Sequence, residues 1–174
     1  GILNYSVAYY PQSACGSTPT TVSGIVGTSY NLTGPLASGT TYSFKVTTYN
    51  NSKLPTTSAC SGDITIDTSA PTFTPIMITA ADIVGGADTR YDDDVEFYTV
   101  WTAATDNQSG IRDYTVSRYA LAGCAGAATV FSSQSGLSLV HSGLVSGTTY
   151  SFRVTAYNNS ELSTESGCSN SITL

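Results

Sequence analysis

The stretch that decides the fold occurs twice in this chain. Residues 147–154 read GTTYSFRV, and residues 39–46 read GTTYSFKV. The match continues on both sides of this stretch. GIRDYTV at 110–116 matches GILNYSV at 1–7, and two cysteines of each copy fall at matching places. The offset is 109 residues at the start (110 − 1) and 108 later (147 − 39), so the copies differ by one loop residue. This repetition predicts one structural module used twice.

Composition favours β-structure for that module. Only 10% of the 174 residues are charged, against about a quarter in typical domains, while tyrosine and other strand-forming residues are common. A disordered chain would be poor in such residues, and no helical apolar stripe of useful length appears. In the second copy the alternation predicts seven strands, at residues 73–79, 95–101, 111–119, 129–132, 137–141, 149–157 and 169–174. Short strands with turn signals at intervals of roughly ten residues predict an antiparallel sandwich.

The motifs of the second copy resemble a fibronectin type III module. Trp101 ends an early strand, and the run Leu144, Gly147, Tyr150 is similar to the tyrosine corner of that family. In a tyrosine corner the Tyr hydroxyl bonds to the backbone a few residues upstream. Residues 36–42 repeat the run in the first copy. The resemblance implies an all-β chain of tandem antiparallel β-sandwiches of the fibronectin type III or immunoglobulin-like type.

The two copies are predicted to differ in completeness. Residues 69–174 should form a complete module with strands A to G, whereas residues 1–68 should form a partial module with strands C to G only. The partial module lacks strands A and B, and with them a counterpart of Trp101. An uncovered inner face of that kind is rarely tolerated by soluble monomers.

Three explanations of the partial module remain open. The sequence could begin at a proteolytic boundary inside a longer array of modules. The missing strands could come from a neighbouring subunit, as in donor-strand assembly, which would build a filament. The first module could also fold around an unrelated partner or stay partly disordered.

Four cysteines allow three disulfide patterns, and the repeat favours Cys15–Cys60 and Cys124–Cys168. The first cysteine of each pair should follow strand C, and the second should follow the F–G turn at the opposite end of the sheet. Pairing them requires the chain after strand C to fold back, because the Cα atoms must approach within about 7 Å. The rival pattern links one module to a neighbouring module or subunit. A zinc site is disfavoured, since no CxxC spacing or partnering histidine is present.

Polar side chains supply further candidate sites. A weak calcium site, and no other cofactor, is suggested by the aspartates Asp88, Asp92, Asp93 and Asp94. The alternative is that these residues form a solvated turn. Five asparagines head Asn-x-Ser/Thr triplets and are glycosylation candidates: Asn4, Asn31, Asn50, Asn107 and Asn158. Four tyrosines should face solvent and could stack on sugar rings or pack against another subunit: Tyr10, Tyr49, Tyr119 and Tyr157. They could equally be ordinary residues of a half-exposed strand.

The chemistry of the chain argues against several functions. His141 is the only histidine, has no nucleophile elbow near it in sequence, and is expected at a surface or sheet edge, so we expect no enzyme. A net charge of −6 argues against nucleic acid as a partner. No apolar run approaches the 18 residues needed to insert into a membrane.

Few charges, many hydroxyl groups and regularly placed cysteines indicate an oxidising location, outside the cell or on its surface. We therefore expect a non-enzymatic structural or adhesive element of a cell surface or surface filament, with neighbouring modules or further copies as partners. The alternatives are a carbohydrate-binding or spacer module of a secreted hydrolase, and an ectodomain that binds a surface protein.

Overall fold

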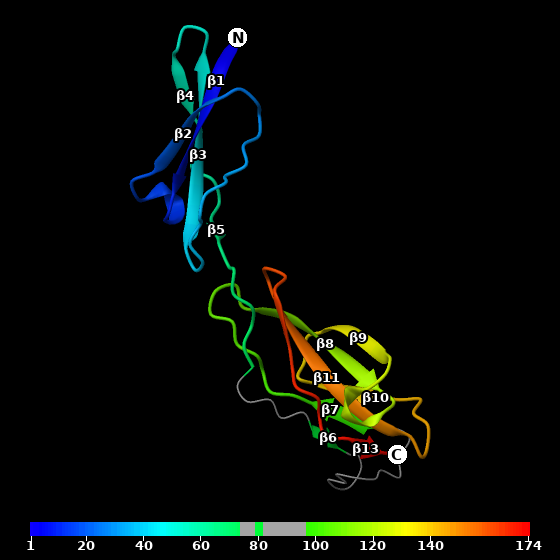
Figure 1. Ribbon diagram of the computed structural model, residues 1–174. Coiled ribbons are helices and arrows are strands. Elements are labelled where there is room, and N and C mark those ends of the chain that lie inside the picture. Colours follow the sequence, from blue (N-terminus) through cyan, green and yellow to red (C-terminus); the bar gives the residue numbers. More distant parts are fainter. Residues whose placement is uncertain (74–78, 82–96) are drawn as a thin grey trace. The chain divides into compact units, whose positions relative to one another are not determined.

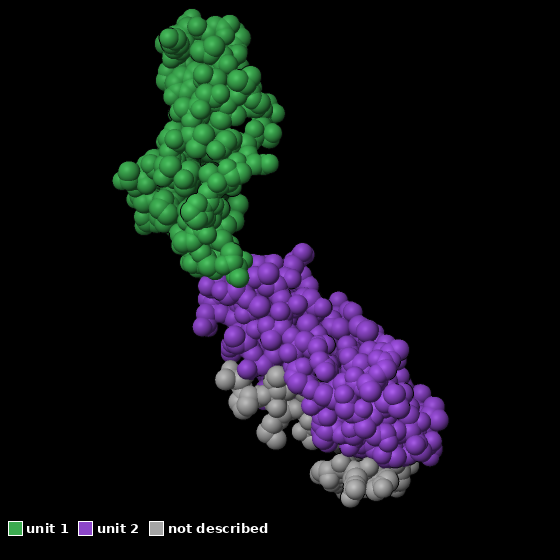
Figure 2. Space-filling view, in the orientation of Figure 1, with its two compact units in different colours: residues 1–68 green, residues 69–174 purple. Residues whose placement is uncertain are grey.

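The computed structural model describes residues 1–73, 79–81 and 97–174. They form two compact units, Gly1–Thr68 and Ser69–Leu174, which are coloured separately in Figure 2. The calcium candidates Asp88 and Asp92 to Asp94 lie outside the described residues, as do parts of the expected strands 73–79 and 95–101.

The second unit contains two antiparallel sheets (Figure 1). One sheet has the order β12-β11-β8-β9, with β13 also paired to β11, and the other has the order β10-β7-β6. The strands are β6 (Thr79–Ala81), β7 (Phe97–Val100), β8 (Ile111–Tyr119), β9 (Ala128–Gln134), β10 (Ser138–His141), β11 (Thr149–Asn158), β12 (Ser163–Glu165) and β13 (Ile172–Thr173).

Alternation along β11 explains why the second unit has a core. Tyr150, Phe152, Val154 and Ala156 share one face of the strand and are all buried. They join a single apolar cluster that includes Trp101, which follows β7 of the other sheet. The core therefore lies between the two layers, as in a β-sandwich.

The first unit contains one sheet, with the order β2-β1-β3-β4 and with β5 also paired to β3. Its strands are β1 (Ile2–Tyr10), β2 (Thr20–Ile25), β3 (Thr41–Asn50), β4 (Pro55–Thr57) and β5 (Ile64–Thr65). The strand E expected in this copy is not formed, since residues 26–40 contain no strand. In the second unit the corresponding strand β10 pairs with β7, and residues 1–68 offer no such strand to pair with.

In both units a tyrosine corner holds the loop that precedes the longest strand, β3 or β11. The Tyr150 hydroxyl accepts a hydrogen bond from the Val145 N–H at 3.0 Å, and the Tyr42 hydroxyl accepts one from the Ala37 N–H at 3.1 Å. The tyrosine ring is buried in each case. The expected corner is thus present in both copies.

Each unit also contains one disulfide, Cys15–Cys60 and Cys124–Cys168, with Cα–Cα distances of 6.0 and 5.8 Å. The first cysteine ends a short 3-10 turn, η1 (Ser13–Cys15) or η2 (Ala122–Cys124), that folds back after β1 or β8. In the first unit the hydroxyl of buried Ser43 anchors this turn, accepting from the Cys15 N–H at 2.9 Å.

The prediction that the second cysteine of each pair lies at the opposite end of the sheet from the first was wrong. Cys60 does not lie at the far end of the sheet, because the N–H groups of Ser58 and Ser61 on either side of it donate to the carbonyls of Val46 and Phe44 in β3. The chain after β4 thus continues along the edge of β3 before it reaches Cys60. This path brings Cys60 close enough to bond to Cys15.

The prediction also placed strand G of the second copy too far along the chain, at residues 169–174. Its pairing with β11 begins at β12 (Ser163–Glu165), is interrupted, and resumes at β13 (Ile172–Thr173). In the interruption the side chains of two serines replace backbone acceptors. Ser166 Oγ accepts from the Val154 N–H, and Ser169 Oγ accepts from the Phe152 N–H, both at 2.9 Å.

Candidate interaction face of the first unit

The inner face of the first sheet has the same apolar residues as the core of the second unit. In the second unit these side chains are buried between two layers: Val116, Phe152, Val154 and Ile172. Their repeat counterparts are Val7, Phe44, Val46 and Ile64. Val46 is 39% exposed where Val154 is 0% exposed, and Ile64 is 55% exposed where Ile172 is 1% exposed. The first unit therefore presents to solvent an apolar surface of the kind that the second unit buries.

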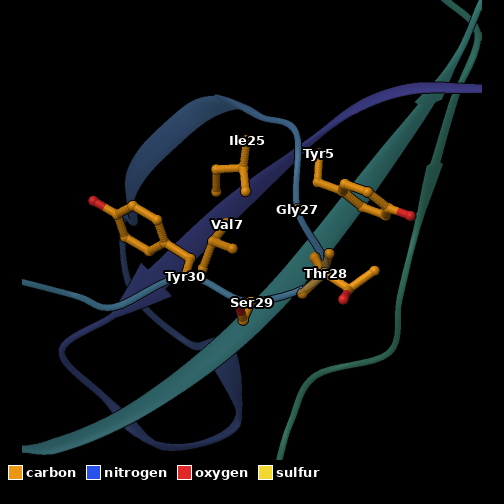
Figure 3. A pocket seen from close by; sticks show the side chains of 8 residues that line it. Tyr5, Val7, Ile25, Gly27, Thr28, Ser29 and Tyr30 are labelled. Carbon is orange, nitrogen blue, oxygen red and sulfur yellow. The ribbon is translucent and has the colours of Figure 1, made fainter.

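A pocket lies on this open face. Tyr5 and Val7 of β1 and Val46 of β3 line it, together with residues 27–30 of the loop after β2. Figure 3 shows the rings of Tyr5 and Tyr30 on either side of Val7. No lining side chain is charged. A pocket of this composition suits an apolar or aromatic group, since burying an unpaired charge there would be costly.

In the second unit the corresponding space is filled by Trp101. Its ring lies 5.7 Å from the ring of Tyr114, which is the counterpart of Tyr5. Its backbone N–H donates to the carbonyl of Leu137 at 3.0 Å. Trp101 is buried, as is Ala104, whose N–H donates to the Tyr114 hydroxyl. One tryptophan therefore joins the two layers of the second unit.

Within each unit the two candidate tyrosines lie at opposite ends of the sheet. Each of them is half-buried: Tyr10, Tyr49, Tyr119 and Tyr157. A cation covers two of the rings, because the Lys45 ammonium lies 5.8 Å from the ring centre of Tyr10 and the Arg112 guanidinium lies 5.5 Å from that of Tyr157. Tyr49 lines a separate, more open pocket with Leu3, Asn4 and Lys53.

The glycosylation candidates divide by burial. Asn31 and Asn107 are exposed, and Asn4 lies beside Tyr49 in the more open pocket. The Asn50 side chain accepts hydrogen bonds from two backbone N–H groups of its own turn. Asn158 is fully buried, so its assignment as a glycosylation candidate was wrong.

The Asn158 side chain is instead a structural link. Its amide donates to the Ser69 carbonyl at 2.9 Å and to Asp106 Oδ2 at 3.1 Å. Asp106 Oδ1 also accepts from three backbone N–H groups of the turn before β8. Burial raises the pKa of Asp106, but the Asn158 amide and these N–H groups lower it by more, so the pKa lies below its usual value.

His141 was expected at a surface or edge and is instead 1% exposed. Its Nε2 lies 3.1 Å from the hydroxyl of buried Thr99 on the neighbouring strand β7. A substrate has no access to this pair, because both side chains lie inside the sandwich. The histidine is a packing residue of the core.

In the part of the chain that the structure describes, the side chains that could ligate a metal are not clustered. Within those residues no three His, Cys, Asp or Glu side chains lie close enough to hold a metal ion. No helix in the described ranges is long and apolar enough to cross a bilayer.

Comparison with known proteins agrees with this architecture. No family model and no curated protein sequence matches the chain. Among solved structures, the crystal structure of chicken CNTN1 FN1-FN3 domains matches 98% of this chain with a TM-score of 0.53, at 20% sequence identity. The matched part is 55% of that neighbour, so this chain spans about half of its length. The chain is thus all-β, and its fold is that of fibronectin type III domains.

Sequence reasoning missed the pocket and the two serine contacts of strand G. A signal for the serines was present, because SACS at 58–61 answers SGCS at 166–169 around the second cysteine. The pocket had a weaker signal, a glycine at matching places in the loop after the second strand of each sheet, Gly27 and Gly136.

Proposed function

We propose that this chain is a non-enzymatic structural or adhesive element of a cell surface or surface filament, built from fibronectin type III-like modules that dock onto one another. The single observation that carries the proposal is the open apolar face of the first unit. Val46 and Ile64 are exposed there, although their counterparts Val154 and Ile172 are core residues. A contiguous apolar surface of this kind is typical of a docking site.

The rest of the molecule supports a mechanical role outside the cell. Each unit is cross-linked by a disulfide, and such bonds persist in oxidising surroundings. With only 10% charged residues, neighbouring modules would repel one another little when they pack. The one histidine is enclosed in the core, which removes the usual general base from reach of a substrate.

Self-association of the oxidised chain tests this proposal. Light scattering coupled to size exclusion, together with negative-stain microscopy, should show assembly that grows with concentration. Val46→Asp should reduce that assembly by placing a charge on the open face. Val26→Asp is the matched control, because Val26 belongs to the same unit, is 84% exposed and does not line the pocket. A monomer at every concentration, or equal loss in both variants, would contradict the proposal.

A further inference from the structure

We propose that the pocket on the first unit receives a tryptophan carried by an extended strand of another copy of this repeat, as Trp101 fills the second unit. This inference rests on the proposed function, because it names the group that docks on the open face. It is carried by three observations: the correspondence between the copies, the backbone available beside the pocket and the neutral lining.

The two copies correspond residue by residue around the pocket. Tyr5 matches Tyr114 and Thr28 matches Leu137, each at the offset of 109 residues (114 − 5 and 137 − 28). A glycine directly precedes Thr28 and Leu137 alike, at the same place in the loop that follows the second strand of each sheet. The structural equivalence therefore extends from the strand to the loop that borders the pocket.

Trp101 contacts the counterparts of two pocket residues. Its ring packs on Tyr114, and its N–H donates to the carbonyl of Leu137. In the first unit the matching residues, Tyr5 and Thr28, both line the pocket. The pocket thus occupies the position that an indole ring takes in the second unit.

A backbone edge is available to hold the incoming strand. In the second unit β7, which leads into Trp101, pairs along its length with β10 (Ser138–His141). The corresponding residues 29–32 of the first unit pair with no strand of that unit. Two of them, Ser29 and Tyr30, line the pocket. An extended segment could therefore add backbone hydrogen bonds along residues 29–32 while it inserts its ring.

The chemistry of the lining selects the group that enters. Its side chains are apolar, aromatic or hydroxyl-bearing, and none is charged. A lysine, arginine or carboxylate would lose its hydration there without gaining a partner. Large aromatic anchors in such pockets contribute much of the affinity of an interface. Tryptophan is the aromatic residue that this repeat places at the equivalent position in its complete copy.

The test uses a synthetic peptide of residues 93–105 with 5-fluorotryptophan at position 101, titrated into the oxidised full chain and followed by fluorine NMR. We expect a saturable change of the fluorine signal. The unlabelled peptide should displace the probe, and the same peptide with Trp101→Ala should compete about 30-fold less well, the loss expected for an aromatic anchor.

Variants of the chain identify the binding position. Val46→Asp should abolish the signal change, since Val46 lines the pocket, whereas Val26→Asp should leave it intact. Tyr30→Ala removes a lining ring without introducing charge and should also weaken binding, which keeps the test informative if Val46→Asp prevents folding. Binding that survives both Val46→Asp and Tyr30→Ala would place the peptide elsewhere and overturn the inference.

The results separate this inference from the proposed function. An absence of saturable binding in a chain that still self-associates would overturn the tryptophan strand as occupant and leave the docking role in place. Saturable, pocket-dependent binding in a chain that stays monomeric would support the occupant and contradict assembly of the chain with itself.

Discussion

His141 lies between two aromatic rings, 5.2 Å from the ring centre of Phe131 and 4.8 Å from that of Phe152. Burial, and to a lesser extent the positive charge of Arg118, lower the pKa of His141 from 6.5 to about 4. The imidazole is therefore neutral at physiological pH, and its energetic role is to fill the core. The same residue type on an exposed strand would keep its usual pKa and act as a switch near neutrality.

This lowered pKa predicts acid sensitivity of the second unit. Below pH 6.5 the unfolded state binds a proton at His141 that the folded state does not bind until about pH 4, so stability falls as the pH falls through that range. The free energy of unfolding should drop by about 2 kcal/mol between pH 8 and pH 5 from this group alone.

Urea titrations followed by fluorescence of Trp101, the only tryptophan, should detect this drop in the wild type and a flatter profile in His141→Gln. No other histidine can contribute. An identical slope in both proteins would show that the pKa of His141 is the same in the folded and unfolded states, which would contradict the prediction.

At the scale of a strand, the edge of each sheet depends on two serines that flank the second cysteine. In the second unit the Ser166 N–H donates to the Val154 carbonyl while Ser166 Oγ accepts from the Val154 N–H. The first unit repeats the arrangement at Ser58 and Val46. The hydroxyl group replaces a backbone carbonyl, so the chain can bulge at the cysteine without leaving a strand N–H unpaired.

Removing one of these hydroxyl groups should therefore destabilise the unit that contains it. Ser166→Ala leaves the N–H of buried Val154 without its acceptor, at a cost of about 1–3 kcal/mol. The midpoint of urea unfolding reported by Trp101 should fall accordingly.

Ser58→Ala is the matched comparison, since it removes the same contact from the first unit, which has no tryptophan. It should leave the Trp101 transition unchanged. An equal shift in both variants would mean that the two units unfold together, and no shift with Ser166→Ala would mean that water replaces the hydroxyl.

Across the whole molecule, two units with closely similar sequence differ in what covers their main sheet. In the second unit a core that includes Trp101 fills the space between the layers, whereas residues 1–68 supply one layer only. Burial of apolar surface is the main favourable term in folding, so the first unit has less to stabilise it. Its disulfide compensates in part by restricting the unfolded chain.

Hydrogen exchange should reveal this difference. Amides of β1 and β3 are expected to exchange faster than those of β8 and β11, because local opening costs less where fewer apolar contacts form. The comparison is well matched, since residues 39–46 and 147–154 differ at a single position and have nearly the same intrinsic exchange rates. Equal protection of the two stretches in the monomeric chain would contradict the difference in stability.

Several features follow from local pattern and could be predicted from sequence. Alternation and turn residues act over a few positions, so the strands 111–119 and 149–157 were expected close to where β8 and β11 lie. The tyrosine corner depends on a spacing of a few residues and was predicted in both copies. Repetition also favoured the disulfide pairs that the structure contains.

Other features depend on which distant segments meet. The burial of His141 and Asn158 follows from contacts with residues far away in the sequence. The position of Cys60 beside β3 also depends on backbone hydrogen bonds between β3 and the chain that follows β4. The pocket beside Tyr5 likewise arises where strand and loop residues come together without a covering layer. Alternation along a strand indicates which side chains share a face. Tertiary packing decides whether a second layer covers that face. A covered face becomes a core, and an uncovered face becomes an exposed surface that can bind a partner.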